Sequence, residues 1–200
     1  MRVVLVSQRV DVLADRGERR DALDQRLADW LASHGLLPVP VPNRAERLDV
    51  LWTQVKPTAV VLSGGNDLGE YGGDAPERDA VERALLARAM AEQVPLFALC
   101  RGAQLLLDAF GNRMEQVAGH VGTRHRVLID GRETEVNSYH QWGCRSLAAP
   151  LKVLARSEDG VIEAFFHPQL PLLGVMWHPE REAPFAELDD LLLNRCLNKE

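Results

Sequence analysis

The chain has 200 residues, 46% of them hydrophobic, and a formal net charge of −6. This length and composition suit one domain over residues 1–200 with a buried core. The chain has no excess of basic residues with which to bind nucleic acid or an acidic membrane surface, so we expect neither as a partner.

The cysteines and the apolar runs predict the compartment. The three cysteines form no CxxC pair and are too few for a disulfide framework. The apolar run near the N-terminus is too short for a signal-peptide core, and no later run approaches the ~18 apolar residues of a membrane span. We therefore expect a reducing, cytoplasmic location.

Strand and helix patterns alternate through the first half of the chain. Short apolar or β-branched runs predict strands at 3–6, 36–41, 58–62 and 95–99. Apolar residues at helical spacing predict helices over 21–34, 44–54 and 78–92, and another that follows Cys100. Three prolines favour an edge position for 36–41. The alternation predicts a doubly wound, mostly parallel sheet with helices on both faces, a three-layer flavodoxin-like α/β fold.

The second half of the chain predicts an antiparallel extension of this sheet. The runs 124–129 and 133–137 flank Asp130-Gly131, a strong hairpin turn signal. Three more strands are expected at 152–156, 161–167 and 172–177, and a closing helix at 184–197.

Three of the early strands end in polar or glycine-bearing segments, at 7–9, 63–67 and 100–102. Ligands bind at the carboxyl ends of the strands in such sheets, so these segments should converge on a site. Gly64-Gly65 alone is more typical of a simple turn than of a functional site. After a buried strand, however, Gly65 can bring a backbone N–H to a reacting carbonyl, with the Arg101 N–H as a second oxyanion donor.

Cys100 lies where a buried strand meets a helix. A sharp turn there exposes the side chain and leaves helix N-terminal N–H groups free, as in a nucleophile elbow. The positive end of the helix dipole also favours a thiolate. Taken alone, the residue is equally compatible with a small buried core cysteine.

His178 and Glu180 follow the last predicted strand. A histidine that acts as a base needs a carboxylate to orient it, and residues i and i+2 of an extended segment share a face. A His-Pro-Glu turn at a strand end is also common without any function. The combination with the cysteine elbow and the glycine donor favours a catalytic triad of Cys100, His178 and Glu180.

These motifs resemble those of the class I glutamine amidotransferases, in which a G-x-C-x-G-x-Q elbow pairs with a later H-P-E. Here Ala98 replaces the first glycine. Three segments resemble motifs of the gamma-glutamyl-gamma-aminobutyrate hydrolase group: Ser63-Gly-Gly-Asn-Asp67, Val136-Asn-Ser-Tyr-His140 and Trp177-His-Pro-Glu180. The segments Ser7-Gln-Arg9, His120-Val-Gly-Thr-Arg-His125 and Met176-Trp-His-Pro-Glu-Arg-Glu182 are similar to those of the gamma-glutamyl-CDP-amidate hydrolases of capsule phosphoramidate synthesis.

The resemblance implies cysteine-dependent hydrolysis of a gamma-glutamyl amide with release of glutamate. We expect the glutamyl group to be held by a set of polar residues that are otherwise ordinary helix-surface and strand-end residues: Gln104, Asn137, Ser138, Tyr139 and His140. Arg9 and Arg124, otherwise surface arginines, are candidates for a phosphate.

The sequence predicts no cofactor. His120 and His125 have no third ligand at a recognisable spacing, so no metal is expected. A glutaminase subunit that supplies ammonia to a partner synthase remains the alternative to a freestanding hydrolase. A non-catalytic sensor is disfavoured because cysteine, histidine and glutamate are all present, and a homo-oligomer remains open.

Overall fold

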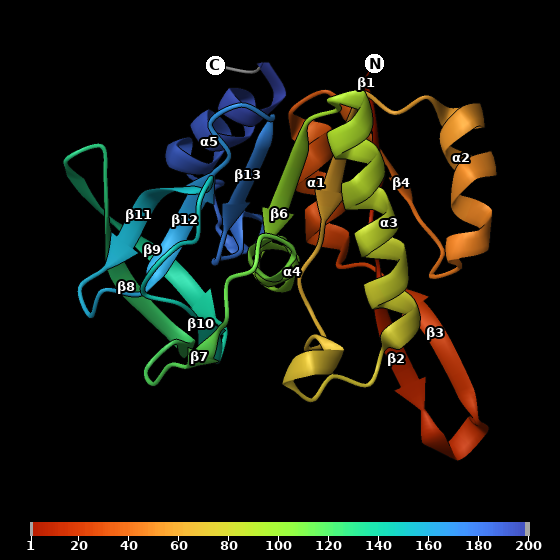
Figure 1. Ribbon diagram of the computed structural model, residues 1–200, viewed down its shortest axis with the longest axis horizontal. Helices are drawn as coiled ribbons and strands as arrows, with labels where there is room; N and C mark the ends of the chain where they lie inside the picture. Colours follow the sequence, from red (N-terminus) through yellow and green to blue (C-terminus); the bar gives the residue numbers. More distant parts are fainter. Residues whose placement is uncertain (1, 199–200) are drawn as a thin grey trace.

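The computed structural model describes residues 2–198. Within this range a nine-stranded sheet has the order β4-β1-β5-β6-β13-β12-β11-β8-β9 (Figure 1). The first five of these strands are mutually parallel: β4 (Leu36–Pro40), β1 (Arg2–Val6), β5 (Ala59–Leu62), β6 (Leu96–Leu99) and β13 (Leu172–Val175). The other four extend it in antiparallel pairs: β12 (Ile162–Phe166), β11 (Lys152–Ser157), β8 (Val121–Ile129) and β9 (Arg132–Tyr139). The predicted parallel sheet with an antiparallel extension is confirmed.

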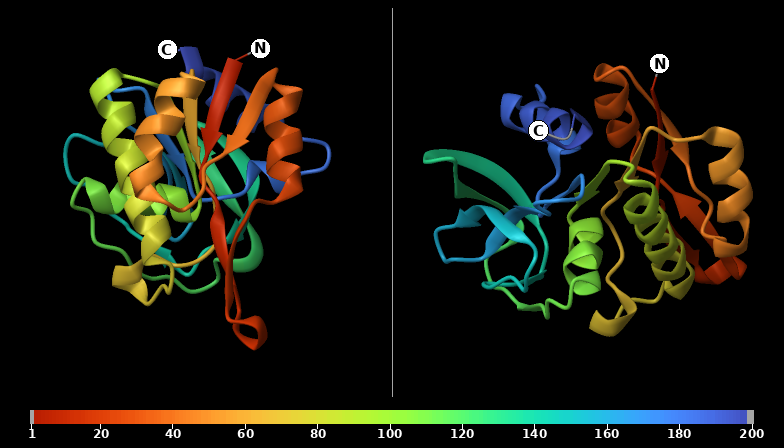
Figure 2. Two further views of the ribbon diagram at one scale, coloured as in Figure 1. Left: turned by 90° about the vertical axis from the view of Figure 1, so that its right-hand side faces the viewer. Right: turned by 45° about the horizontal axis from the view of Figure 1, so that its top comes forward.

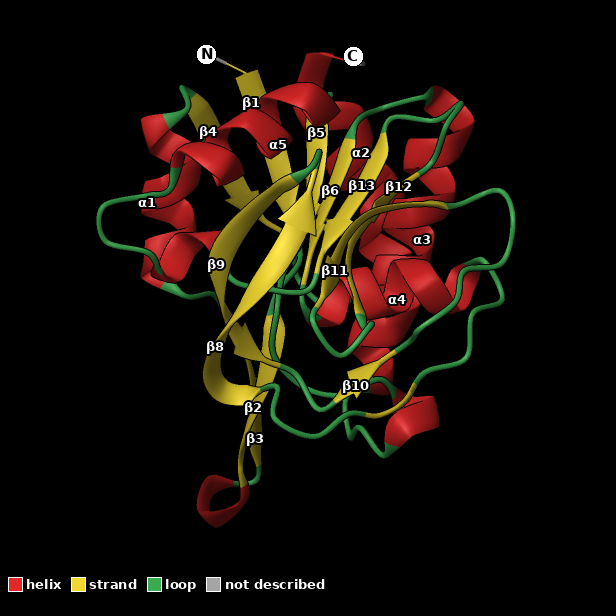
Figure 3. Cartoon of the chain, turned by 90° about the vertical axis from the view of Figure 1, so that its left-hand side faces the viewer, coloured by secondary structure: helices red, strands yellow, loops and turns green. Residues whose placement is uncertain are grey.

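Helices cover both faces of the sheet, so the fold has three layers (Figure 3). One face carries α1 (Gln25–Ser33) and α5 (Glu187–Asn198), which bury Trp30 and Leu193 in a cluster with Phe97. The other face carries α2 (Leu48–Val55), α3 (Pro76–Glu92) and α4 (Arg101–Ala109), which form a second cluster around Leu85 and Leu106. Each such buried side chain stabilises the fold by about 1.5–3 kcal/mol, so these two clusters hold the layers together.

The remaining elements are short. Four 3-10 turns are η1 (Ala14–Arg16), η2 (Ala45–Arg47), η3 (Gly69–Tyr71) and η4 (Pro179–Arg181). A small separate ladder pairs β7 (Glu115–Gln116) with β10 (Trp142–Gly143). No helix within residues 2–198 is long and apolar enough to cross a membrane.

The prolines of β4 and the Asp-Gly turn behave as predicted. β4 is the edge strand of the parallel half, where a missing N–H donor is tolerated. Asp130 and Gly131 both have positive φ, 48° and 77°, and they join β8 to β9. This backbone twist matches that of the two flanking strands.

A hairpin between β1 and α1 was not predicted. β2 (Arg9–Leu13) pairs with β3 (Glu18–Ala22), and the hairpin projects from the body of the molecule (Figure 2). The expected helix start at residue 21 is therefore wrong: α1 starts at Gln25, capped by Asp24, whose side chain accepts from the Arg26 N–H at 3.0 Å. The charged, mostly exposed residues of β3 carry no apolar alternation that would have indicated a strand.

The strand order determines where the site forms. β5, β6 and β13 are neighbours and run in the same direction. Their carboxyl ends lead directly into Gly64-Gly65, Cys100 and His178, respectively. Three segments that are distant in sequence therefore lie at one edge of the sheet, and two of them, 63–67 and 100–102, belong to the predicted convergence.

Candidate active site

Cys100 occupies the turn between β6 and α4 in a strained backbone conformation. Its φ of 47° and ψ of −107° are uncommon for a residue with a side chain. The Cys100 N–H donates to the Val175 carbonyl at 2.8 Å, so the turn is fixed to β13. A Cβ atom at Gly102 would lie 2.4 Å from the Leu62 carbonyl oxygen. Glycine there lets α4 start directly against the end of β5.

Ala98 stands where the motif has glycine, and its methyl group is accommodated in this elbow. Ala98 is fully buried and packs in the same cluster as Leu62 and Leu105. The core of this chain therefore has room for a methyl group at a position where the motif has glycine.

His178 and Glu180 form a hydrogen-bonded pair beside Cys100. His178 Nδ1 lies 2.7 Å from Glu180 Oε1, and both side chains are buried. Burial alone lowers the pKa of His178, but Cys100 and Glu180 outweigh it and raise this pKa to about 9. At neutral pH the imidazole is thus held in its charged form next to the sulfur. A Cys-His pair in this state has the nucleophile and the proton donor of acyl transfer.

Asn137 holds the histidine segment from β9, the edge strand of the antiparallel half. Its Oδ1 accepts from the His178 N–H at 3.0 Å, and its Nδ2 donates to the His178 carbonyl at 2.8 Å. A third bond runs from Nδ2 to Glu182 Oε1 at 2.7 Å. Asn137 therefore positions His178, because both polar atoms of its side-chain amide are already hydrogen-bonded to these partners.

The Gly64-Gly65 turn packs directly against the histidine ring. A Cβ at Gly64 would lie 2.5 Å from His178 Cε1, so a side chain there would displace the ring. Gly65 has a φ of 88°, in the region that glycine adopts readily. Across the site the first N–H groups of α4 have no partner within the helix, and the Arg101 N–H is the first of them. Two backbone segments with N–H groups thus flank Cys100.

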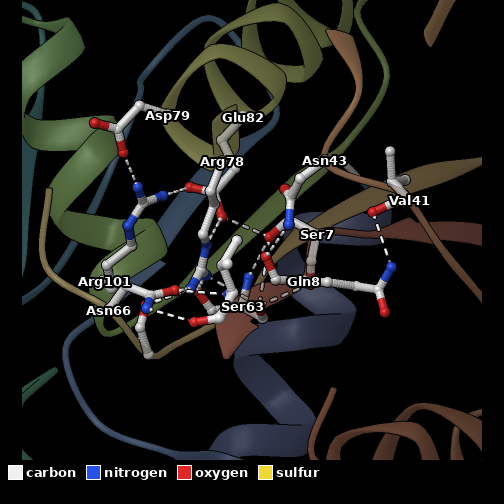
Figure 4. A network of polar contacts seen from close by, with 12 residues as sticks. Ser7, Gln8, Val41, Asn43, Ser63, Asn66, Arg78, Asp79, Glu82 and Arg101 are labelled. Carbon is white, nitrogen blue, oxygen red and sulfur yellow. Dashed lines mark hydrogen bonds and ion pairs between the residues drawn. The ribbon is translucent and has the colours of Figure 1, made fainter. Parts of the chain in front are cut away.

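A buried ionic network lies beneath these segments (Figure 4). The Arg78 guanidinium donates to the carbonyls of Ser63, at 2.6 Å, and Gly65, and it pairs with Glu82 Oε1 at 2.8 Å. Glu82 also accepts from the Ser7 hydroxyl at 2.7 Å and pairs with the Arg101 side chain. The network therefore joins the ends of β1 and β5 to the start of α4.

The two arginines of this network remain charged. Burial lowers the pKa of each to about 9, which is still well above neutral pH. Arg101 is further paired with Asp79, so α3 supplies two carboxylates, Glu82 and Asp79, to the two cations. A compensated network of this kind can hold the loop that contains Gly65 in one conformation.

Comparison with known proteins identifies the family of this chain. The family model "Glutamine amidotransferase class-I" matches residues 20–187. The chain belongs to the class I glutamine amidotransferase family. It is 36% identical over 126 residues to a gamma-glutamyl-CDP-amidate hydrolase from Campylobacter jejuni, a match that covers 62% of each chain. Less than two thirds of that enzyme's length is thus matched.

Two further similarities span more of the chain. A gamma-glutamyl-gamma-aminobutyrate hydrolase from Escherichia coli is 27% identical over 205 residues, covering 82% of this chain and 81% of that enzyme. The crystal structure of a glutamine amidotransferase from Thermotoga maritima superimposes with a TM-score of 0.69 at 16% identity, covering all of this chain and 91% of the other. The structural similarity supports the fold.

The cavity of this amidotransferase-family domain has a volume of about 340 Å³ and opens onto Cys100. Its lining includes most of the residues that sequence analysis selected: Gly65, Cys100, Arg101, Gln104, Tyr139, His140 and His178. A second hollow of about 310 Å³, near the start of β13, contains none of them. The cavity at the carboxyl ends of the strands is therefore the candidate site.

Four of the residues proposed as substrate contacts do not line this cavity. Asn137 positions His178, and the buried Ser138 hydroxyl donates to the His120 carbonyl at 2.7 Å. Arg124 binds the carboxylates of Glu135, at 2.7 Å, and Glu182, at 2.9 Å, so its charge is already compensated outside the cavity.

Arg9 is the fourth of these residues. It pairs with Asp11 at 2.7 Å and lies behind Gly65, facing a smaller hollow. That hollow is also lined by His178, Glu180 and Arg181.

Arg181 also lines the cavity, and sequence reasoning did not select it. Its guanidinium lies 4.3 Å from the centre of the Tyr139 ring, and its Nε is 3.9 Å from Glu180 Oε1. That buried Nε has no hydrogen-bond partner among the described residues. The signal that could have found it is its place one residue after Glu180, in the same turn as the catalytic candidates.

The raised pKa of His178 predicts the basic limb of the pH profile. The imidazolium is present below about pH 9 and is lost as the pH rises through that value, so kcat/KM should fall there. Glu180→Gln removes one of the two stabilising partners, so the limb should move to lower pH and kcat should fall about 100-fold or more. Glu135→Gln, an exposed carboxylate on β9, is the matched control. Coincident profiles for Glu180→Gln and wild type would contradict the assignment.

Proposed function

We propose that this protein is a cysteine-dependent hydrolase of a gamma-glutamyl amide that releases glutamate. The observation that carries this proposal is the meeting of Cys100, at a strained elbow, with His178 on one cavity, where Glu180 is hydrogen-bonded to the histidine. Family membership and the names of the two hydrolase relatives support the same chemistry.

The reaction follows from the positions of these groups. The Cys100 thiolate attacks the gamma-carbonyl, and the N–H groups of Gly65 and Arg101 stabilise the oxyanion that forms. The His178 imidazolium donates its proton to the leaving nitrogen, which departs as an amine and leaves a thioester on Cys100. His178 then takes a proton from water, the resulting hydroxide attacks the thioester, and glutamate is released.

The polar groups of the cavity wall suit the two ends of such a substrate. The Gln104 side chain is oriented by its bond to the Trp142 carbonyl at 3.1 Å, and Asp67 lies on the same wall. We assign these two to the glutamyl ammonium, and Tyr139 to the wall of the same pocket. His140 faces the cavity, but its nitrogens already lie near the Trp142 carbonyl and Glu163.

Arg181 is our candidate for an anionic leaving part. A phosphate seated over Tyr139 could be held by its guanidinium in the bidentate manner that arginine favours. A nucleotide phosphoramidate such as gamma-glutamyl-CDP-amidate, with a role in capsule synthesis, would supply such an anion, and the Campylobacter relative carries that substrate in its name.

The test offers the purified protein a panel of gamma-glutamyl amides with neutral and phosphate-bearing leaving groups, and free glutamine, with glutamate release as the readout. We expect turnover of the gamma-glutamyl amides without any added protein and a preference for the phosphate-bearing members. Ammonia release from glutamine that appears only when a synthase is added would instead favour the glutaminase-subunit function.

Arg181→Gln separates the anion contact from the chemistry. We expect kcat/KM for a phosphate-bearing substrate to fall about 10- to 100-fold, the scale of a hydrogen bond to a charged group, with little change for a neutral one. Arg124→Gln, the compensated arginine outside the cavity, is the control and should affect neither substrate. Equal losses on both substrates would refute the role of Arg181.

A further inference from the structure

Two histidines and a glutamate meet in the antiparallel half of the sheet. His120 precedes β8, His125 lies within it, and Glu163 comes from β12. His120 and Glu163 are buried, and His125 is partly buried. One nitrogen or oxygen atom from each lies within 4.8 Å of the others. The third ligand that the sequence did not reveal is thus supplied by a strand far along the chain.

The atoms converge on a point, at ion-pair distances but without hydrogen-bond geometry between them. His120 Nδ1 lies 3.1 Å and His125 Nε2 lies 3.4 Å from the same oxygen, Glu163 Oε1. Among residues 2–198 these three buried atoms have no partner with hydrogen-bond geometry. Ligand atoms of a tetrahedral zinc ion, with bonds of about 2.0–2.1 Å, are about 3.3 Å apart. Unpaired buried polar atoms are costly, so an occupant would account for all three.

A second layer of groups orients these ligands. Asp159 Oδ2 lies 3.3 Å from His120 Nε2, the nitrogen on the far side of the ring from the convergence point. His140 Nε2 lies 3.3 Å from Glu163 Oε2, which leaves Oε1 to face the two histidines. A carboxylate behind a ligating histidine is the usual support of a protein zinc site, because it sets the tautomer and the ring orientation.

We propose that His120, His125 and Glu163 bind a divalent transition-metal ion of the zinc class. Two imidazoles and one carboxylate make up the protein ligands, and water occupies the fourth position. The ion would fasten the β8–β9 hairpin to β12 and so fix the wall of the active-site cavity to which Val121 and His140 contribute. The site shares no residue with the proposed triad, so this proposal does not depend on the proposed function.

The experiment measures metal binding directly. Chelator-stripped full-length protein is titrated with zinc by calorimetry, in the Cys100→Ala background so that the nucleophile cannot bind the ion. We expect one ion per chain, and a melting temperature about 5–10 °C higher when free zinc exceeds its Kd about 100-fold. Cobalt should give the visible absorption of a tetrahedral site.

Variants identify the ligands. His125→Gln and Glu163→Gln should each weaken zinc binding at least about 100-fold, since each loses a direct ligand. His34→Gln is the matched control, because His34 also faces a carboxylate, Asp190 at 2.9 Å, but lies on the opposite half of the molecule. Partly exposed His125 is the decisive position if Glu163→Gln fails to fold. No binding by the parent protein, or equal affinity in folded His125→Gln, would overturn the proposal.

Discussion

Cys100→Ala is expected to abolish glutamate release, lowering kcat by about 10⁴-fold or more, because the group that forms the thioester is lost. The elbow is held by backbone bonds and by the packing of α4, and not by the sulfur, so the melting temperature should stay close to that of wild type. Initial rates on a gamma-glutamyl amide and a thermal melt on the same sample provide the measurement.

The other two cysteines serve as internal controls. Burial raises the pKa of the Cys144 thiol to about 11 and that of Cys196 to about 12, so both are almost entirely thiols at neutral pH. A glutamine-like electrophile should therefore label Cys100 and spare these two, as peptide mass mapping would show. An adduct on Cys144, or glutamate release that persists in Cys100→Ala, would disprove the nucleophile assignment.

Arg78→Ala is expected to produce the largest loss of stability. It removes the donors to the carbonyls of Ser63 and Gly65 and leaves Glu82 with less compensation in the interior. Removing one partner of a buried ion pair costs about 3–5 kcal/mol of unfolding free energy, which urea denaturation would measure. Because the loop of Gly65 loses its anchor, kcat should fall as well.

Arg83→Ala is the matched control on the same helix. Arg83 pairs with Asp108 at 2.6 Å but is substantially exposed, so its loss should cost no more than about 1 kcal/mol. Arg78→Lys keeps the charge but lacks the planar fork, and it should recover only part of both stability and activity. If the two arginine-to-alanine variants were equally stable, the network would not have the role assigned to it.

The sequence motifs located the reactive groups because their local signals are strong. Cys100-Arg101-Gly102 combines a strand end, a positive-φ turn and a helix start within a few residues, and His178-Pro-Glu180 places two side chains on one face. Those properties depend on near neighbours in the chain. Prediction of the substrate contacts was weaker because it depended on which side chains face a common cavity, and local patterns do not contain that information.

Arg124 and Arg181 illustrate the difference. Both are arginines close to expected strand ends, and the sequence signal for Arg181 is only its position next to Glu180. The choice depends on the carboxylates around each: Glu135 and Glu182 compensate Arg124, whereas Arg181 lies over Tyr139 beside the cavity. Asn137 likewise has a side chain of the type that contacts substrates, but its position on β9 places it against the backbone of His178, to which it is hydrogen-bonded.

The sequence by itself determined the alternation of strands and helices, the edge position of β4, the Asp130-Gly131 turn and the elbow cysteine, because hydrophobic periodicity and turn chemistry are local properties. Only the tertiary structure decided the strand order that brings β5, β6 and β13 together, the charged β2–β3 hairpin, the Arg78–Glu82 network and the meeting of His120, His125 and Glu163. Each of these depends on pairing between residues distant in the chain, and the free energy of such pairing is not encoded in any short segment.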